Sequence, residues 1–136
     1  MASVFSRIIA GELPARFVWT DDRCVAFLPI APLRSGHVLV VPREEVDHWL
    51  DLDAGLLAHL FDVAQRIGRA LQQAYRPTKV GLILAGLEVP HVHVHLVPID
   101  NLRDLDFANA DTDPDPSVLD ADAETIRAAL GQLDAG

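Results

Sequence analysis

His91-Val92-His93-Val94-His95-Leu96-Val97 is the most informative stretch of this sequence. Side chains alternate between the two faces of a β-strand, so the three histidines of this stretch are predicted to share one face. Imidazoles about 6–7 Å apart along a strand can attack phosphorus, hold a metal ion or respond to pH. A purely structural role is disfavoured, because each buried imidazole needs hydrogen-bond partners that valine or threonine would not need.

The size and charge of the chain limit the functions that it can have. With 136 residues, half of them apolar, it has the size of one domain with one good hydrophobic core. Its net charge of −9 argues against nucleic acid or an anionic membrane as a partner, because these polyanions require a basic surface. The single cysteine, Cys24, excludes an internal disulfide, and no segment is long and apolar enough to span a bilayer. We therefore expect a soluble cytoplasmic protein.

Hydrophobic periodicity predicts an α+β fold built around an antiparallel sheet. Residues 4–9 are predicted to form a short helix that stops at Gly11. From Asp53, a plausible N-cap, to Tyr75, apolar residues recur every three or four positions, which predicts a long amphipathic helix. Runs rich in β-branched and aromatic residues predict five strands, at 17–20, 25–28, 37–41, 80–85 and 91–97.

The composition changes in the last part of the chain. Residues 111–116 are acidic and rich in proline, which predicts a linker in which helix and strand are both disfavoured. A helical stripe returns over residues 117–133, with acidic residues in its first turns. We expect residues 1–110 to form the domain, and residues 111–136 to form the linker and a helix that docks on the domain or on a partner subunit.

The order of these elements and the histidine pattern resemble the histidine triad (HIT) family, in its bacterial Hint-like branch. The family motif is His-x-His-x-His followed by apolar residues, which residues 91–97 match position for position. The stretches from Phe5 to Pro14 and from Gly36 to Arg43 also follow the family pattern. The resemblance implies a HIT-like antiparallel sheet with one long helix and short terminal helices. It also implies that His37 lies beside the histidine row.

The resemblance also implies a chemistry for these residues. In the family the middle histidine, here His93, attacks the α-phosphorus of a nucleotide, and water then hydrolyses the nucleotidyl-histidine intermediate. His91 and His95 are the other catalytic residues that it implies, as contacts to the phosphate or as groups that fix the tautomer of His93. The implied substrates are purine nucleoside phosphoramidates, aminoacyl adenylates or dinucleoside polyphosphates, with no cofactor. The implied substrate-binding residues are His37, Phe27, Ile30, Gly86, Glu88 and Val89.

Three segments depart from the family pattern. Phe27-Leu28-Pro29-Ile30 lacks the acidic residue with which many relatives bind the ribose hydroxyls. Gly86-Leu87-Glu88-Val89 stands where relatives carry Gly-Gln-Ser/Thr-Val, and its carboxylate would repel phosphate or donate a proton to the leaving group. Ser3-Val4-Phe5-Ser6 stands where some bacterial relatives carry the Cys-x-x-Cys of a structural zinc site, so no structural zinc is expected.

Two other functions are compatible with the same residues. A nucleotide-binding module would keep the fold and the histidines but turn over little, which the departures at Pro29, Leu87 and Glu88 favour. A zinc site would use His91, His93 and His37, since such a set can leave one coordination position to water. Copurified metal would distinguish this second alternative from the first.

The resemblance implies a homodimer, in which the two sheets join into one continuous sheet. The helix at 55–75 supports this assembly, because its apolar residues exceed one narrow stripe. These residues are Leu56, Leu57, Leu60, Phe61, Val63, Ala64 and Ile67.

Overall fold

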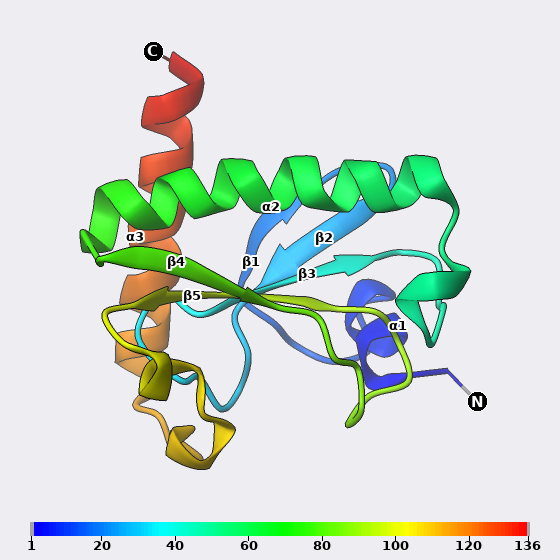
Figure 1. The fold of residues 1–136 in the computed structure, drawn as a ribbon, viewed down its shortest axis with the longest axis horizontal. Helices are drawn as coiled ribbons and strands as arrows, with labels where there is room; N and C mark the ends of the chain where they lie inside the picture. The colour runs from blue at the N-terminus through cyan, green and yellow to red at the C-terminus, as the bar shows by residue number, and fades with distance from the viewer. Residues whose placement is uncertain (1, 136) are drawn as a thin grey trace.

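In the computed structural model, which describes residues 2–135, one five-stranded antiparallel sheet is flanked by helices (Figure 1). The spatial order of its strands is β1-β2-β3-β5-β4, and every neighbouring pair is antiparallel. This confirms the predicted α+β fold. The strands are β1 (Phe17–Thr20), β2 (Cys24–Phe27), β3 (Val38–Pro42), β4 (Lys79–Ile83) and β5 (Val94–Ile99).

The central strands are buried on both faces because helices cover both sides of the sheet. Val38 and Val40 of β3 pack into the core beneath the long helix, whereas Leu39 and Val41 pack into a second cluster on the opposite face. This is the alternation that a strand imposes on its side chains. The sheet therefore separates two apolar clusters, and the second cluster borders the candidate site.

The long helix α2 (Ala54–Tyr75) lies across one face of the sheet (Figure 1). The side chain of Asp53 accepts a hydrogen bond from the backbone N–H of Leu56 and so caps the first turn. Arg76 ends the helix in the left-handed conformation, and Pro77 prevents its continuation. The predicted helix and its N-cap are both confirmed.

The short helix α1 (Val4–Ile9) packs against the opposite face of the sheet. Its Phe5 ring meets the ring of Phe27 edge to face, with 5.6 Å between the ring centroids. Gly11 follows with a positive φ of 82°, a conformation that glycine adopts without strain. The predicted helix at residues 4–9 and its stop at Gly11 are confirmed.

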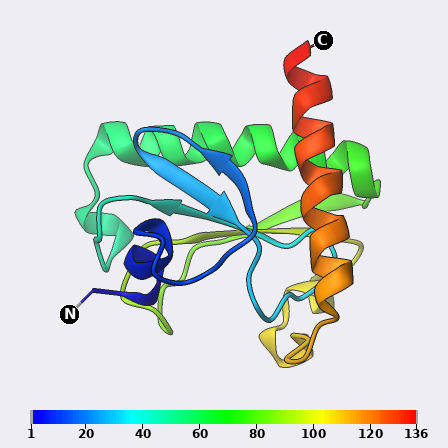
Figure 2. The same cartoon turned by 180° about the vertical axis from the view of Figure 1, so that it is seen from behind.

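The last helix, α3 (Pro116–Ala135), packs against α2 and β1 of the same chain (Figure 2). Its buried side chains are those of Leu119, Ala123, Ile126, Ala129 and Leu130. Before it, two single-turn 3-10 helices, Leu102–Leu105 and Phe107–Asn109, follow β5. Hydrophobic periodicity does not reveal these two turns, because one turn is shorter than the period that it would have to repeat.

Candidate active site

The histidine row lies at the start of β5, on the face of the sheet that α1 covers. Val92, Val94 and Leu96 point into the core beneath α2, so the three histidines between and before them lie on the other face. The predicted strand at 91–97 is wrong at its start, because β5 begins only at Val94. Before that residue the backbone N–H of Val92 donates to the carbonyl of Val46, and the sheet ladder has not yet begun.

His93 is held in the tautomer that a nucleophile needs. Its Nδ1 lies 2.7 Å from the carbonyl oxygen of His91. A carbonyl only accepts, so Nδ1 must donate, and in the neutral ring Nε2 then carries the lone pair. Phe5 packs edge to face against the same ring at a centroid distance of 4.9 Å.

His37 and His95 form a second pair beside His93. The Nδ1 of His37 accepts the backbone N–H of Leu33 at 2.9 Å, so its Nε2 carries the proton and donates to Nδ1 of His95 at 3.0 Å. Because Nδ1 of His95 accepts this hydrogen bond, Nε2 of the neutral His95 ring bears the hydrogen. The centroid of the His95 ring also lies 4.9 Å from that of the His93 ring, so this N–H belongs to a ring that packs against His93.

Gly36 brings His37 to this position. Its φ is 92°, and a Cβ on it would lie 2.8 Å from Cγ of Pro98 and 2.9 Å from the ring of Tyr75. Only glycine combines this backbone conformation with so close an approach. The Gly36-His37 pair just before β3 therefore places a fourth imidazole beside the row.

The imidazoles of His37, His91 and His95 are neutral at pH 7. Burial, and secondarily the His95 ring, lowers the pKa of His37 to about 3. Burial, and secondarily His93, lowers the pKa of His95 to about 4. Burial likewise lowers the pKa of His91. The tautomers inferred from the hydrogen bonds are therefore those of uncharged rings.

His91 is fully buried, and both of its ring nitrogens have protein partners. Nε2 lies 2.7 Å from the carbonyl oxygen of Pro42, and Nδ1 lies 2.7 Å from Oγ of Ser3. Zinc binding by His37, His91 and His93 would therefore have to break a hydrogen bond of His91 to Pro42 or to Ser3.

Within residues 2–135, the side chains of Asp21, Cys24 and His59 form one cluster in which three metal-ligating atoms lie within 4.8 Å of one another. The carboxylate of Asp21 already accepts from Nε2 of His59 at 2.8 Å and from Nε1 of Trp19 at 2.7 Å. Burial and the Asp21 carboxylate raise the pKa of the Cys24 thiol to about 12, which makes it a poor metal ligand. The cluster joins α2 to the turn between β1 and β2.

A cavity of about 880 Å³ opens over the histidines on this face. Phe27, Leu39 and His95 are cross-strand neighbours on β2, β3 and β5 and form its floor. Side chains of α1 form one wall. Five of the six residues expected to bind substrate line the cavity, namely Phe27, Ile30, His37, Glu88 and Val89. The sixth, Gly86, does not line it.

Phe107 also lines the cavity, and the sequence analysis did not identify it. Its ring packs edge to face against His95 at a centroid distance of 5.0 Å. It belongs to the 3-10 helix Phe107–Asn109, outside the stretches that resemble the family. An aromatic residue within a polar segment was the only available signal, and such a residue is not specific for a site. Asp120 of α3 lines the cavity as well, with its carboxylate 2.7 Å from Nε of Arg16.

The fold and the site define a class of proteins in which a small antiparallel sheet, crossed by a long helix, presents paired imidazoles beside an apolar cavity. Residues 10–102 match the family described as HIT domain. An uncharacterized HIT-like protein of Mycobacterium tuberculosis is 34% identical over 143 aligned positions, which cover 99% of this chain and 97% of the relative. The chain belongs to the HIT family.

Solved structures of HIT proteins agree with this assignment. A zinc-bound histidine triad family protein of Mycobacterium smegmatis superposes with a TM-score of 0.85 at 30% identity, over 99% of this chain and 97% of that one. A HIT family hydrolase of Legionella pneumophila gives a TM-score of 0.61 at 26% identity, over 71% of this chain and 91% of that one.

The residues at the Cys-x-x-Cys position of this chain do not fit a zinc ion. Ser3 and Ser6 replace the two cysteines, and serine hydroxyls are not among the side chains that bind structural zinc. Both hydroxyls are already bonded to protein, Ser3 to His91 and Ser6 to Glu45. At this position the chain therefore has hydrogen bonds of two serine hydroxyls where some bacterial relatives have two cysteine ligands to zinc.

Proposed function

We propose that the protein is a nucleotidyl hydrolase or transferase that cleaves purine nucleoside phosphoramidates or dinucleoside polyphosphates at the α-phosphate. The observation that carries this proposal is the hydrogen bond from Nδ1 of His93 to the carbonyl of His91, which leaves the Nε2 lone pair for attack. The cavity beside His93 provides room for a ligand of nucleotide size.

Two covalent steps would follow from this arrangement. Nε2 of His93 attacks the α-phosphorus, and the bond from phosphorus to the leaving nitrogen or oxygen breaks as the leaving group takes up a proton. Water then attacks the same phosphorus, and the bond from phosphorus to His93 breaks and restores the imidazole. The Nε2–H of His95 would donate to a phosphate oxygen in both transition states, where charge on that oxygen grows.

The apolar part of the cavity supports a nucleoside as the rest of the substrate. Phe5, Ile8 and Phe27 offer aromatic and aliphatic surface to a flat ring, and a purine buries more such surface than a pyrimidine. The Legionella relative is named a hydrolase, which supports turnover rather than binding alone.

The test is incubation of the protein with adenosine and guanosine phosphoramidates and dinucleoside polyphosphates. We expect nucleoside monophosphate as a product and a nucleotidyl adduct on the protein in quenched samples, seen by mass spectrometry. Binding without product or adduct would instead establish the nucleotide-binding module, which the departures at Leu87 and Glu88 favour. Neither binding nor product would contradict both functions.

Glu88 is expected to favour substrates of low charge. It lines the cavity and its side chain is exposed, so as a carboxylate it repels a phosphate chain in proportion to the chain's charge. Glu88→Ser should strengthen binding of a dinucleoside polyphosphate several-fold relative to a nucleoside monophosphate. The difference should shrink at high salt, since screening acts over about 8 Å at physiological ionic strength. Calorimetric titrations at two salt concentrations measure both effects.

Glu44→Gln is the matched control, because Glu44 is an exposed carboxylate outside the cavity. It should leave the ratio of the two affinities unchanged. If Glu88→Ser also leaves that ratio unchanged but lowers turnover across a pH series, Glu88 donates a proton to the leaving group and the repulsion account is wrong.

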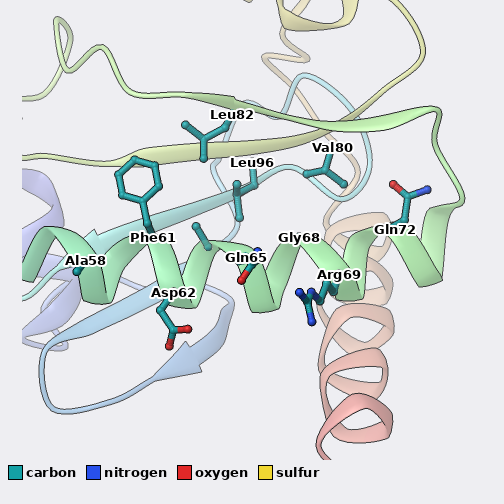
Figure 3. Close-up of a pocket in the computed structure, with 11 residues that line it drawn as sticks. Ala58, Phe61, Asp62, Gln65, Gly68, Arg69, Gln72, Val80, Leu82 and Leu96 are labelled. Atoms are coloured by element: carbon teal, nitrogen blue, oxygen red, sulfur yellow. The ribbon is translucent and has the colours of Figure 1, made fainter.

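We propose that the protein is a homodimer that joins through α2 and the free edge of β4. The sheet already covers five of the seven apolar residues on which the dimer prediction rested, since Leu56, Leu60, Val63, Ala64 and Ile67 are buried within one chain. Phe61 stays 41% exposed and points toward Leu82 of β4, which is 43% exposed (Figure 3). A second copy would cover this groove and pair the edge strand, which otherwise presents free backbone groups.

Leu82→Asp should convert the dimer into a monomer, because it places a carboxylate in the groove that the partner would cover. Light scattering at micromolar concentration should give twice 14.8 kDa for the wild type and 14.8 kDa for the variant. Leu50→Asp is the control, since Leu50 is 65% exposed outside the groove. A wild-type mass of 14.8 kDa would exclude the dimer.

A cytoplasmic location is part of the proposal. The only thiol, that of Cys24, is buried and protonated, as suits a reducing compartment. Across residues 2–135, the helices lack the combination of length and apolarity that crossing a bilayer requires. Fractionation of cells that express the tagged protein tests the location.

A further inference from the structure

A hydrogen-bonded cluster links the start of α1 to His91. Oε1 of Glu45 accepts the backbone N–H of Ser3 at 2.6 Å and the hydroxyl of Ser6 at 2.7 Å. Oγ of Ser3 lies 2.7 Å from Nδ1 of His91, and both of these residues are buried. The cluster includes Ser3, Ser6 and Glu45, to which the proposed reaction assigns no role.

Ser3 donates the hydrogen bond that it shares with His91. The carbonyl of Pro42 accepts from Nε2 of His91, so that nitrogen carries the ring proton. Nδ1 of the neutral ring therefore accepts, and the Ser3 hydroxyl donates to it. The same hydroxyl oxygen accepts the backbone N–H of Ser6 at 3.0 Å and caps α1. Ser3 thus performs two functions with one hydroxyl.

The position of His91 determines the position of His93. The carbonyl of His91 accepts from Nδ1 of His93 at 2.7 Å, and this bond leaves the lone pair on Nε2. Phe5, two residues after Ser3, packs against both rings, at centroid distances of 5.8 Å to His91 and 4.9 Å to His93. A displacement of His91 that moved both its ring and its backbone carbonyl would therefore disturb the packing and the hydrogen bond that hold the nucleophile.

We propose that Ser3 is a positioning residue of the active site: its hydroxyl holds His91 in the neutral Nε2–H tautomer, and His91 in turn fixes the orientation of His93. Glu45 supports this role, because its carboxylate accepts the backbone N–H of Ser3 and so anchors that residue. The catalytic consequence rests on the proposed function, but the tautomer of His91 does not.

The first experiment measures the tautomer directly. In wild-type protein, long-range ¹⁵N–¹H NMR spectra of the imidazoles should show His91 protonated at Nε2 only at pH 7. Ser3→Ala should shift the Nδ1 resonance or add a second ring state, because Nδ1 loses its donor. Ser3→Thr restores a hydroxyl and should restore the wild-type spectrum. If Ser3→Ala leaves the His91 resonances unchanged, Ser3 does not hold the ring, whether or not the protein is an enzyme.

The second experiment measures turnover of adenosine 5′-phosphoramidate. We expect Ser3→Ala to lower kcat about tenfold with KM within twofold, because the nucleophile is misoriented while the cavity is intact. Ser6→Ala is the matched control. It removes a hydroxyl of the same helix that bonds only to Glu45 and should keep kcat within twofold.

The pH dependence separates positioning from a loss of stability. A donor to Nδ1 favours the neutral ring, so its removal should raise the pKa of His91 and move the acid limb of kcat to higher pH. Glu45 and His93 are the titratable groups that face His91, and the Glu45 carboxylate favours the shift. Thermal melts establish that each variant is folded. A folded Ser3→Ala protein with wild-type kcat and acid limb would overturn the proposed positioning role, and an inactive wild type would instead overturn the proposed function.

Discussion

His93→Ala should lower turnover of adenosine 5′-phosphoramidate by at least about 10³-fold, because the first covalent step has no other nucleophile. His93 is the only imidazole of the row whose protonated nitrogen is bonded to a carbonyl while its ring still borders the cavity. His95 has its lone pair bonded to His37, and His91 has both nitrogens bonded. Product analysis and mass spectrometry of quenched samples should show neither monophosphate nor adduct.

The variant should remain folded, since the histidines lie on the cavity face and not in the core beneath α2. His48→Ala is the matched control, because His48 is exposed and outside the cavity, and it should keep full activity. Addition of free imidazole to His93→Ala should restore part of the turnover. Substantial hydrolysis by the folded variant without imidazole would exclude the covalent mechanism.

The second large effect that we expect is a fall in the free energy of unfolding between pH 7 and pH 5. Histidines of the unfolded chain take up protons below about pH 6.5, whereas the folded chain protonates His95 only near pH 4 and His37 only near pH 3. The unfolded state therefore binds more protons in this window, and stability falls as the pH falls. Each of these two histidines should cost about 2 kcal/mol between pH 7 and pH 5, at about 1.4 kcal/mol per pH unit.

Urea unfolding at a fixed protein concentration measures this dependence. His37→Gln removes one of these titrations and should reduce the loss between pH 7 and pH 5 by about 2 kcal/mol, which leaves the contributions of His95 and His91. The Asp21 carboxylate does not interfere. Burial raises its pKa, but hydrogen bonds from Trp19 and from backbone N–H groups outweigh burial and hold the pKa well below its usual value, and stability from such a group is lost only at lower pH. An unfolding free energy that stays constant from pH 7 to pH 5 would contradict the neutral histidine cluster.

The sequence was sufficient to predict those elements in which a regular spacing of apolar residues repeats over many positions. The helix from Ala54 to Tyr75 and its cap at Asp53 follow from six turns of apolar spacing, and the alternation around His93 correctly gives the face that the histidines share. The same alternation misplaced the start of β5. Ring nitrogens and backbone groups of His91 bond to Ser3, Pro42 and Val89, and a pattern of side chains contains no information about such partners.

Contacts between distant parts of the chain were not predictable. Phe107 meets His95 because a polar segment after β5 folds back over the cavity, and Glu45 meets Ser3 across more than forty residues. Both contacts depend on the three-dimensional path of loops, where local preferences are weak. The motif was therefore enough to predict the candidate nucleophile, whereas the residues that surround and support it could be identified only from the structure.

The cavity combines the first and last helices of the chain, with Phe5 on one wall and Asp120 on another. During synthesis a chain emerges from its N-terminus, so the histidine row leaves the ribosome before α3 exists. A nascent chain that has not yet reached α3 therefore carries the imidazoles without the part of the wall that Asp120 provides. A chain that lacked α3 would therefore retain the histidine motif but lose the part of the cavity wall that Asp120 provides.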